Sequence, residues 1–318
     1  MRALVLDGEP RLATVPEPHV DEGEALVAVR VAGVCDTDLQ LARGYMNFTG
    51  VPGHEFVGEV LSGTLRGRRV VADINAGCGV CSACTEGPPG LRGHHCPTRT
   101  VLGIVTRSGA FAERLALPER CLVPVPDTLA DDRAVFAEPV AAALHVSDDL
   151  SAVDGPVAVL GDGKLGLLIA MALAAEGRAV TLVGHHAEKL ALASRLGIPT
   201  TLEVDLTRRG DHAAVVDATG HGSGLALALA LCRPRGRVIL KTTVQDPGAV
   251  DWSLVVIHEL SIVGSRCGDL PRAVDVLDRG LVDPTPLVEA RYPLDRALEA
   301  FHHAGRRGTR KILVDVAG

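Results

Sequence analysis

A cysteine, a hydroxyl, a histidine and two acids stand close together near the start of the chain. In the segments GVCDTDLQ and VPGHEFVGEV these residues are Cys35, Thr37, Asp38, His54 and Glu55. Thiolate and imidazole groups are ligands that Zn²⁺ prefers, and a zinc site with one open position can bind a substrate oxygen. The Thr37 hydroxyl can carry a proton to or from that oxygen, and Asp38 can orient the histidine. A lone cysteine–histidine pair is more often a buried thiol and a core histidine, so the prediction depends on the rest of the chain.

A second group of cysteines lies in the segment CGVCSACTEGPPGLRGHHC. Its members are Cys78, Cys81, Cys84 and Cys96. Disulfides between cysteines so close in sequence are geometrically awkward, whereas one structural zinc ion held by four thiolates accounts for all of them. His94 or His95 is the alternative to Cys96 as the fourth ligand. Prolines and glycines between the third and fourth cysteines predict a loop there rather than a helix.

A glycine motif, G-x-G-x-x-G, occurs in the segment VLGDGKLG. Alone it is a weak signal, and an ordinary glycine-rich turn would produce it. Here it follows a predicted strand and opens a predicted helix, which is the arrangement that places a dinucleotide pyrophosphate on a helix N-terminus. The residues predicted to bind a coenzyme there are Gly161, Gly163, Lys164, Leu165 and Gly166.

The end of the next predicted strand, AVTLVGHH, indicates which dinucleotide is bound. NAD-specific folds usually carry Asp or Glu there to bind the ribose 2′-hydroxyl. This chain has Gly184, followed by His185, with Lys189 a turn later. A strand end without a carboxylate does not repel a 2′-phosphate, and His or Lys can bind one. The sequence therefore slightly favours NADP, with NAD or dual use left open; the alternative is that the histidines are exposed loop residues.

The composition of the chain limits the class of protein and the partners that the sequence can indicate. The chain has 318 residues, is 47% hydrophobic and 3% aromatic, and carries a formal net charge of −7. Mixed charges without basic blocks argue against nucleic acid and membrane surfaces as partners. The first residues lack the apolar run of a signal peptide, so we expect a cytoplasmic protein with reduced thiols. The remaining cysteines, Cys121, Cys232 and Cys267, are interpreted as structural thiols.

The pattern of the chain changes near residue 135. Before it, short β-branched runs broken by Gly and Pro predict an irregular, mostly antiparallel β domain. An alanine-rich stretch at 131–146 predicts a helix, after which strands and helices alternate as in a doubly wound parallel sheet. The segment at 223–236, SGLALALALCRPRG, is predicted to be one of these helices. Further helical segments and a final strand, KILVDV, follow.

These motifs, in this order, resemble the medium-chain zinc-dependent alcohol dehydrogenase family. The segments that carry the resemblance are GVCDTDLQ, GHEFVGEV, CGVCSAC, FAEPVAAALH and VLGDGKLG, and together they span most of the chain. The resemblance implies an α/β protein with a GroES-like β-barrel catalytic domain at 1–140 and a Rossmann coenzyme domain at 141–272. Residues 273–318 would return to the catalytic domain, and the structural zinc lobe would lie at about 75–100.

The resemblance also implies roles for particular residues. Cys35 and His54 would bind the catalytic zinc. Glu138, in FAEPV, matches the position where polyol dehydrogenases carry a glutamate ligand, with water, substrate or Glu55 completing the set. The alternative is that Glu138 is a carboxylate on the surface of a helix and binds no metal. Arg310 resembles the family arginine that reaches the coenzyme pyrophosphate.

The chain departs from the family pattern in three places. Gln40 stands where many relatives have the histidine that ends the proton relay, and an amide cannot take up a proton. Asp36 puts a negative charge near the expected pyrophosphate. The loop before Cys96 is longer than usual, which makes this cysteine a less certain ligand than the first three.

The activity implied is reversible oxidation of an alcohol to an aldehyde or ketone with NAD(P), and the glutamate ligand favours a polar, polyol-like substrate. The resemblance also implies a homodimer or homotetramer. One alternative is a zinc-independent quinone or enone reductase of the same superfamily, which would lack the ligands. Another is a non-catalytic zinc- and nucleotide-binding protein, which only Gln40 favours.

Overall fold

The computed structural model describes residues 1–207, 209–243 and 249–317, and the chain divides into two compact units. Unit 1 contains Met1–Glu138 and Asp269–Gly318, and unit 2 contains Pro139–Gly268. The sequence predicts domain bounds after residues 140 and 272. In the structure the corresponding divisions follow Glu138 and Gly268. In the part of the chain described, no helix is long and apolar enough to cross a membrane.

Unit 1 is built on a seven-stranded sheet with the order β10-β5-β4-β3-β18-β17, and β9 also pairs with β3. Its strands are β3 (Glu24–Gly33), β4 (Glu55–Val60), β5 (Arg69–Ala72), β9 (Arg114–Pro118), β10 (Leu122–Pro124), β17 (Val288–Pro293) and β18 (Lys311–Asp315). Smaller sheets are formed by β1 (Arg2–Asp7) with β2 (Glu9–Thr14), and by β6 (Asn75–Ala76), β7 (Thr100–Leu102) and β8 (Thr106–Arg107). The strand latest in the sequence, β18, thus lies between two others in the main sheet.

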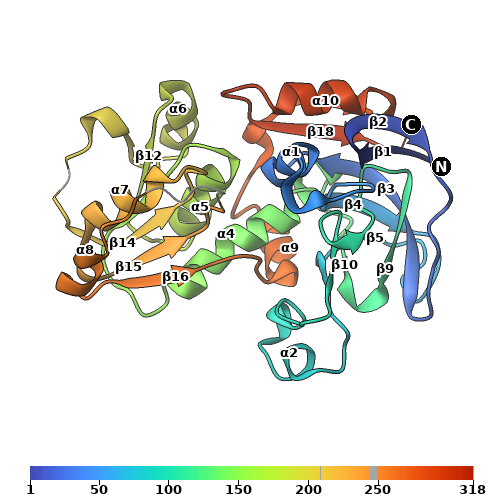
Figure 1. Ribbon diagram of the computed structural model, residues 1–318, viewed down its shortest axis with the longest axis horizontal. Coiled ribbons are helices and arrows are strands. Elements are labelled where there is room, and N and C mark those ends of the chain that lie inside the picture. The colour runs from blue at the N-terminus through green and yellow to red at the C-terminus, as the bar shows by residue number, and fades with distance from the viewer. Residues whose placement is uncertain (208, 244–248, 318) are drawn as a thin grey trace. The chain divides into compact units, whose positions relative to one another are not determined.

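The helices of unit 1 are short: α1 (Asp36–Ala42), α2 (Ser82–Thr85), α3 (Asp131–Ala134), α9 (Leu270–Asp278) and α10 (Ala297–Ala304). The loop that carries α2 extends away from the sheet, at the bottom of Figure 1. The helix predicted over 131–146 is divided, because turn residues separate α3 from α4 (Ala137–Asp149).

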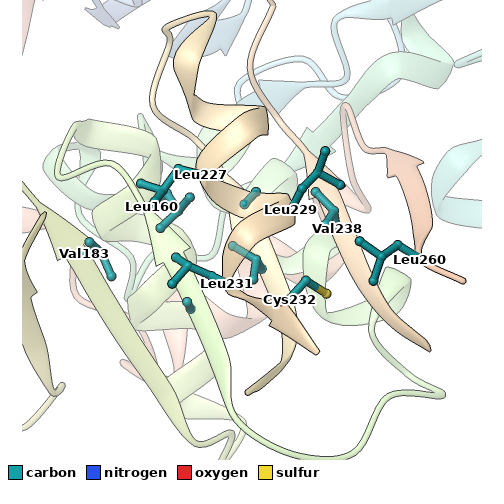
Figure 2. Packing of buried hydrophobic residues seen from close by; sticks show 11 residues of the cluster. Leu160, Val183, Leu227, Leu229, Leu231, Cys232, Val238 and Leu260 are labelled. Atoms are coloured by element: carbon teal, nitrogen blue, oxygen red, sulfur yellow. The ribbon is translucent and has the colours of Figure 1, made fainter. Parts of the chain in front are cut away.

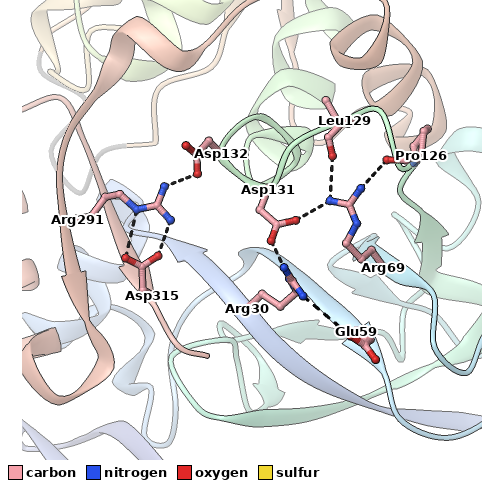
Figure 3. A network of polar contacts seen from close by, with 9 residues as sticks. All are labelled: Arg30, Glu59, Arg69, Pro126, Leu129, Asp131, Asp132, Arg291 and Asp315. Atoms are coloured by element: carbon pink, nitrogen blue, oxygen red, sulfur yellow. Dashed lines mark hydrogen bonds and ion pairs between the residues drawn. The ribbon is translucent and has the colours of Figure 1, made fainter. Parts of the chain in front are cut away.

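A network of ion pairs fixes α3 to the sheet (Figure 3). Asp131 accepts hydrogen bonds from Arg30 Nε and Arg69 Nη1, each at 2.7 Å. Arg69 also donates to the carbonyls of Leu129 (2.9 Å) and Pro126 (2.7 Å). Asp131 therefore links β3, β5 and the turn that leads into α4.

Unit 2 is a six-stranded parallel sheet with the order β13-β12-β11-β14-β15-β16. Its strands are β11 (Val157–Leu160), β12 (Val180–Gly184), β13 (Thr200–Leu202), β14 (His212–Asp217), β15 (Cys232–Leu240) and β16 (Ser261–Gly264). Its helices after α4 are α5 (Lys164–Ala175), α6 (Ala187–Arg195), α7 (Ser223–Leu231) and α8 (Trp252–Ile257). Figure 2 shows leucines of α7 packed with apolar residues of the sheet strands.

The helix predicted over 223–236 is wrong in its second half, because α7 ends at Leu231 and β15 begins at Cys232. Proline at position 234 disfavours helical backbone in the residue before it and cannot donate the helix hydrogen bond. Arg235 has a φ of 61°, which also ends a helix. The alanine–leucine run masked these signals in the sequence.

Candidate metal centre and coenzyme site

The turn before α1 holds the first metal-ligand candidates. Cys35 is the N-cap of α1, with extended backbone, and its amide donates to Asp38 Oδ2 at 2.8 Å. This contact is half of a capping box, which fixes the start of the helix. The Thr37 hydroxyl oxygen lies 3.7 Å from Cys35 Sγ. Helix capping therefore places the hydroxyl beside the thiol.

His54 immediately precedes β4 and is 4% exposed. Its Nδ1 lies 3.3 Å from Oδ1 of Asp38, which is fully buried. This is ion-pair distance, but the angles do not make a regular hydrogen bond. Burial by itself lowers the pKa of His54, yet the nearby Asp38 carboxylate and Cys35 thiol raise it well above its ordinary value. The imidazole is thus held between an acid and a thiol.

The donor atoms of Cys35, His54 and Glu55 all lie within 4.8 Å of one another. A thiol, an imidazole and a carboxylate form a donor set that suits zinc. Among the residues that the structure describes, this group does not include Glu138, which is half-buried at the start of α4. The structure thus brings Glu55 to the cysteine–histidine pair more closely than the predicted third ligand.

Glu55 is also held from the other side by Lys311. The two side chains form an ion pair in which the lysine is 2% and the glutamate 3% exposed, and Lys311 Nζ also donates to the Val34 carbonyl at 3.3 Å. Burial lowers the pKa of Lys311, but the Glu55 carboxylate outweighs this effect and raises it. Gly33 faces Glu55 across β3 and β4, and a side chain at Gly33 would collide with the Glu55 carboxylate.

The four thiols of the lobe lie together, with all Sγ atoms within 4.8 Å of one another. Cys81 Sγ is 3.6 Å from Cys84 Sγ, and Cys96 Sγ accepts a hydrogen bond from the Cys78 amide at 3.3 Å. This arrangement suits a closed tetrahedral zinc site. The longer loop does not keep Cys96 away from the other three.

The environment of Cys96 favours a thiolate, the form that binds zinc. Hydrogen bonds from Thr98 and from the Cys78 amide lower the pKa of the Cys96 thiol to about 6. By contrast, burial and hydrogen bonds with neighbouring thiols raise the pKa of Cys81, in the same group, to about 12, and burial raises that of Cys121, outside the group, to about 12. His94 faces Asp73, with Nε2 2.6 Å from Oδ2.

The glycine motif forms the turn between β11 and α5. Gly161 has a φ of 107°, a conformation that side chains disfavour, and a Cβ on Gly166 would collide with the Gly161 carbonyl. Nothing lies within 4 Å of a Cβ built on Gly163, so the backbone there is open to an approaching group. Lys164 and Leu165 follow as the first residues of α5. A close turn, an open backbone and a helix N-terminus fit a dinucleotide pyrophosphate.

The residues after β12 lie around a carboxylate that the sequence analysis did not single out. His185 is exposed, and its Nε2 lies 3.1 Å from Glu203 Oε2. Lys189 is only 8% exposed. Gly184 is contacted by Asp162, whose carboxylate occupies the space where a Gly184 side chain would begin. Asp162 was missed in the sequence, although it stands inside the glycine motif.

The remaining predicted residues lie in unit 1. Arg310 contacts Glu289, donating from its amide at 3.0 Å and from Nε at 3.3 Å. Gln40 lies on α1, half-buried, and Asp36 is the first residue of that helix. Lys311 was missed by sequence reasoning; the one signal was a charged residue directly before the apolar run at 312–314 of β18.

Comparison with known proteins identifies the family. The sequence profile of the alcohol dehydrogenase GroES-like domain matches residues 21–127, and that of the zinc-binding dehydrogenase domain matches residues 165–279. The chain belongs to the medium-chain zinc-dependent alcohol dehydrogenase family, whose members use NAD(P); solved relatives contain NADH or NADP.

Individual relatives are similar over nearly their whole length. An L-threonine 3-dehydrogenase of Mesorhizobium japonicum is 28% identical, covering 99% of this chain and 98% of the relative. An erythritol/L-threitol dehydrogenase of Mycolicibacterium smegmatis is 29% identical, covering 92% and 91%. The solved alcohol dehydrogenase TADH of Thermus sp. ATN1 is 26% identical, with a TM-score of 0.88, covering 99% and 100%.

Proposed function

We propose that this chain is a zinc-dependent dehydrogenase that oxidises a secondary alcohol on a small, hydroxylated molecule and reduces NAD(P). A hydride leaves the CH–OH carbon for the nicotinamide, and the hydroxyl proton leaves for solvent, so that a carbonyl and NAD(P)H are formed. The observation that carries the proposal is the donor group of Cys35 and His54 with the Thr37 hydroxyl beside it.

We propose Cys35, His54 and Glu138 as the ligands of the reactive zinc, with Glu55 as the competing carboxylate. Zinc held there supplies Lewis acidity to the substrate oxygen. The chain's own groups do the rest: Asp38 orients His54, and Thr37 accepts the substrate proton and passes it on. The amide of Gln40 cannot receive that proton, so we propose that Thr37 passes it to water rather than along α1.

The substrate class is proposed from chemistry and from relatives. Threonine, erythritol and threitol all carry a secondary hydroxyl with polar groups on neighbouring carbons, and they are named in the relatives' activities. A site with a carboxylate ligand in place of a second thiolate suits such substrates. We therefore favour polyols and hydroxylated acids over simple aliphatic alcohols.

We also propose a cytoplasmic homodimer or homotetramer. All eight cysteines are free thiols, which suits a reducing compartment. The edge strand β16 ends the six-stranded sheet, and α8 leaves three large apolar side chains exposed, namely Trp252, Val256 and Ile257. An exposed apolar patch and a strand edge together mark a surface that another protein chain covers.

The experiment that tests the function is a substrate panel with bound metal measured alongside. Wild-type protein is assayed with polyols, L-threonine and simple alcohols, using NAD and NADP. Its zinc content is compared with that of Cys35→Ala, Glu138→Ala and Glu55→Ala. The matched control is Cys232→Ala, which removes a buried thiol outside both donor groups.

We expect Cys35→Ala to lose one of two zinc ions per chain and all turnover, because one donor group loses a ligand while the other keeps its four. Cys232→Ala should keep both ions and its activity. Unchanged turnover in Cys35→Ala would refute the proposed function. Loss of zinc in Glu55→Ala but not in Glu138→Ala would assign the third ligand to Glu55.

A further inference from the structure

Asp162 is a buried acid in the coenzyme turn that no step described so far uses. It lies between Gly161 and Gly163 and is 6% exposed. Its Oδ2 accepts hydrogen bonds from the amides of His185 and His186, both at 2.7 Å. Its carboxylate oxygens also lie 3.0 and 3.1 Å from His186 Nδ1. The side chain thus crosses from the first turn of the unit 2 sheet to the loop after β12.

The Asp162 carboxyl is ionised at neutral pH. Burial by itself raises the pKa of a carboxyl, but the amide and ring of His186 and the amide of His185 outweigh burial and lower the pKa of Asp162. A fixed negative charge therefore sits at the end of β12. In dinucleotide-binding parallel sheets, the adenosine ribose is bound at the end of this strand.

Because Gly184 has no side chain, Asp162 of the glycine motif can supply the negative charge at the end of β12. A Cβ on Gly184 would lie 2.6 Å from the Asp162 Cβ and would also collide with its carboxylate. The usual acidic side chain at the strand end and Asp162 therefore exclude each other. The chain keeps a carboxylate at this place but supplies it from the glycine motif.

Asp162 also occupies the amide donors that a 2′-phosphate would use. Anions bind to loop amides before a helix, and here the amides of His185 and His186 already donate to Oδ2. Oδ1 retains acceptor capacity, because a carboxylate oxygen can accept more than one hydrogen bond. A free 2′-hydroxyl can donate to such an oxygen, whereas a phosphate cannot.

The basic side chains near Asp162 do not restore a preference for a coenzyme with a 2′-phosphate. His185 pairs with Glu203, which adds a second acid to the region, and Lys189 is buried. The sequence-based preference for NADP rested on Gly184 leaving the strand end without a carboxylate. Asp162 supplies that carboxylate.

We propose that Asp162 makes the coenzyme site selective for NAD over NADP, by holding the amides that a 2′-phosphate needs and by offering an acceptor to a free 2′-hydroxyl. This inference rests on the proposed function, since it concerns the coenzyme of that reaction. It concerns binding of the adenosine half, so it can be tested without substrate or turnover.

The test measures equilibrium binding of NADH and NADPH, by their fluorescence, to zinc-loaded protein. The adenosine half is measured separately with 5′-AMP and adenosine 2′,5′-bisphosphate by calorimetry. The variants are Asp162→Asn, Asp162→Ala and the double variant Asp162→Gly/Gly184→Asp, which returns the acid to the strand end. Asp154→Ala, which removes the same charge from an exposed loop of unit 2, is the matched control. Thermal unfolding of each variant checks that it is folded.

We expect the wild type and Asp154→Ala to bind NADH at least about tenfold more tightly than NADPH, because like charges repel across a close contact. Asp162→Ala and Asp162→Asn should lose most of that ratio, mainly by binding NADPH and the bisphosphate more tightly. The double variant should restore the preference for NADH.

Three results would overturn the inference. The first is a wild type that prefers NADPH, and the second is an equal loss of affinity for both dinucleotides in the Asp162 variants, which would make Asp162 a support of the loop only. The third is failure of folded wild-type protein to bind either dinucleotide, which would overturn the proposed function as well. Only the third result affects both proposals.

Discussion

The pair of Glu55 and Lys311 shows how single residues shape the metal centre. Each side chain is nearly inaccessible, and each is the other's only charge partner among the ion pairs found in the described residues. A buried charge without a partner is costly, whereas the pair is close to balanced. Gly33 provides the room for this contact. Lys311 thereby holds in place a carboxylate that lies among the zinc-ligand candidates.

We predict that Lys311→Met destabilises the protein with no zinc at the Cys35–His54 site by about 3 kcal/mol, because the buried Glu55 carboxylate loses its ion-pair partner. The double variant Lys311→Met/Glu55→Gln should recover most of this loss, since it removes both charges. Denaturant unfolding of the two single variants and the double variant measures the coupling. Additive losses would contradict a direct buried pair.

At the scale of secondary-structure elements, the loop around α2 positions the four thiols of the second metal group. The lobe around α2 contains few apolar residues, and its four thiols come from one loop. Such a loop has little core of its own, so its order depends on the metal. The lobe and the donor group near α1 should therefore respond separately to loss of a ligand.

We predict that Cys96→Ser lowers the zinc content by one ion per chain and makes the lobe susceptible to proteolysis, while zinc at Cys35 is retained. Zinc analysis and limited proteolysis between residues 78 and 96 measure these effects. Thr98→Val, which removes only a hydrogen-bonding partner of the Cys96 sulfur, is the milder control. Full zinc retention in Cys96→Ser would show that another group, such as His95, completes the site.

We predict that Asp131→Asn costs about 2 kcal/mol at neutral pH, because two arginines lose a charged acceptor in a partly buried network. Asp132→Asn, whose acid is exposed beside Arg291, should cost less than about 1 kcal/mol. Unfolding free energies measured at several pH values test both.

The dependence on pH follows from the lowered pKa of Asp131, in which hydrogen bonds from Arg30 and Arg69 outweigh the raising effect of burial. A lowered pKa gives stability that is fully present above the unfolded value of about 3.9 and is lost as the pH falls through the folded value. The difference between wild type and Asp131→Asn should therefore be constant above about pH 5 and shrink below about pH 4. A difference that persists in acid would mean that the charge is not responsible.

The sequence predicted the parts of the molecule that depend on local pattern. Alternating strands and helices, the glycine motif and the cysteine spacing are all readable within short windows. The structure places all four lobe cysteines together, although the long loop argued against Cys96. Contacts between distant segments were not readable: Glu55 and Lys311 are 256 positions apart. Asp162 was missed for another reason, because the motif directs attention to the glycines and not to the residue between them.

At the scale of the whole molecule, the proposed dimer or tetramer needs a surface that a second copy of the chain would cover, and the exposed apolar cluster of α8 is the candidate. Val256 on α8 is 77% exposed beside other apolar residues, whereas Val204, also in unit 2, is 83% exposed without such a cluster. Scattered apolar residues on a surface are common, but a cluster near a strand edge is not.

We predict that Val256→Glu reduces the mass of the particle in solution, because a charge in an apolar subunit contact weakens association. Light scattering after size-exclusion chromatography measures it, and Val204→Glu is the matched control. A dimer or tetramer unchanged in Val256→Glu would remove α8 from the subunit contact.

The position of β18 has a consequence for how the protein is made. This strand pairs with Val31–Gly33 of β3, yet a ribosome synthesises it only after all of unit 2. Unit 2 is one continuous segment and can fold as it emerges, whereas the main sheet of unit 1 must wait. During that interval part of β3 is an open edge and Glu55 has no cation, which is the condition in which nascent chains aggregate. We therefore expect molecular chaperones to crosslink to β3 and β4 of nascent chains that stop before Lys311, and to release them once β18 has been synthesised.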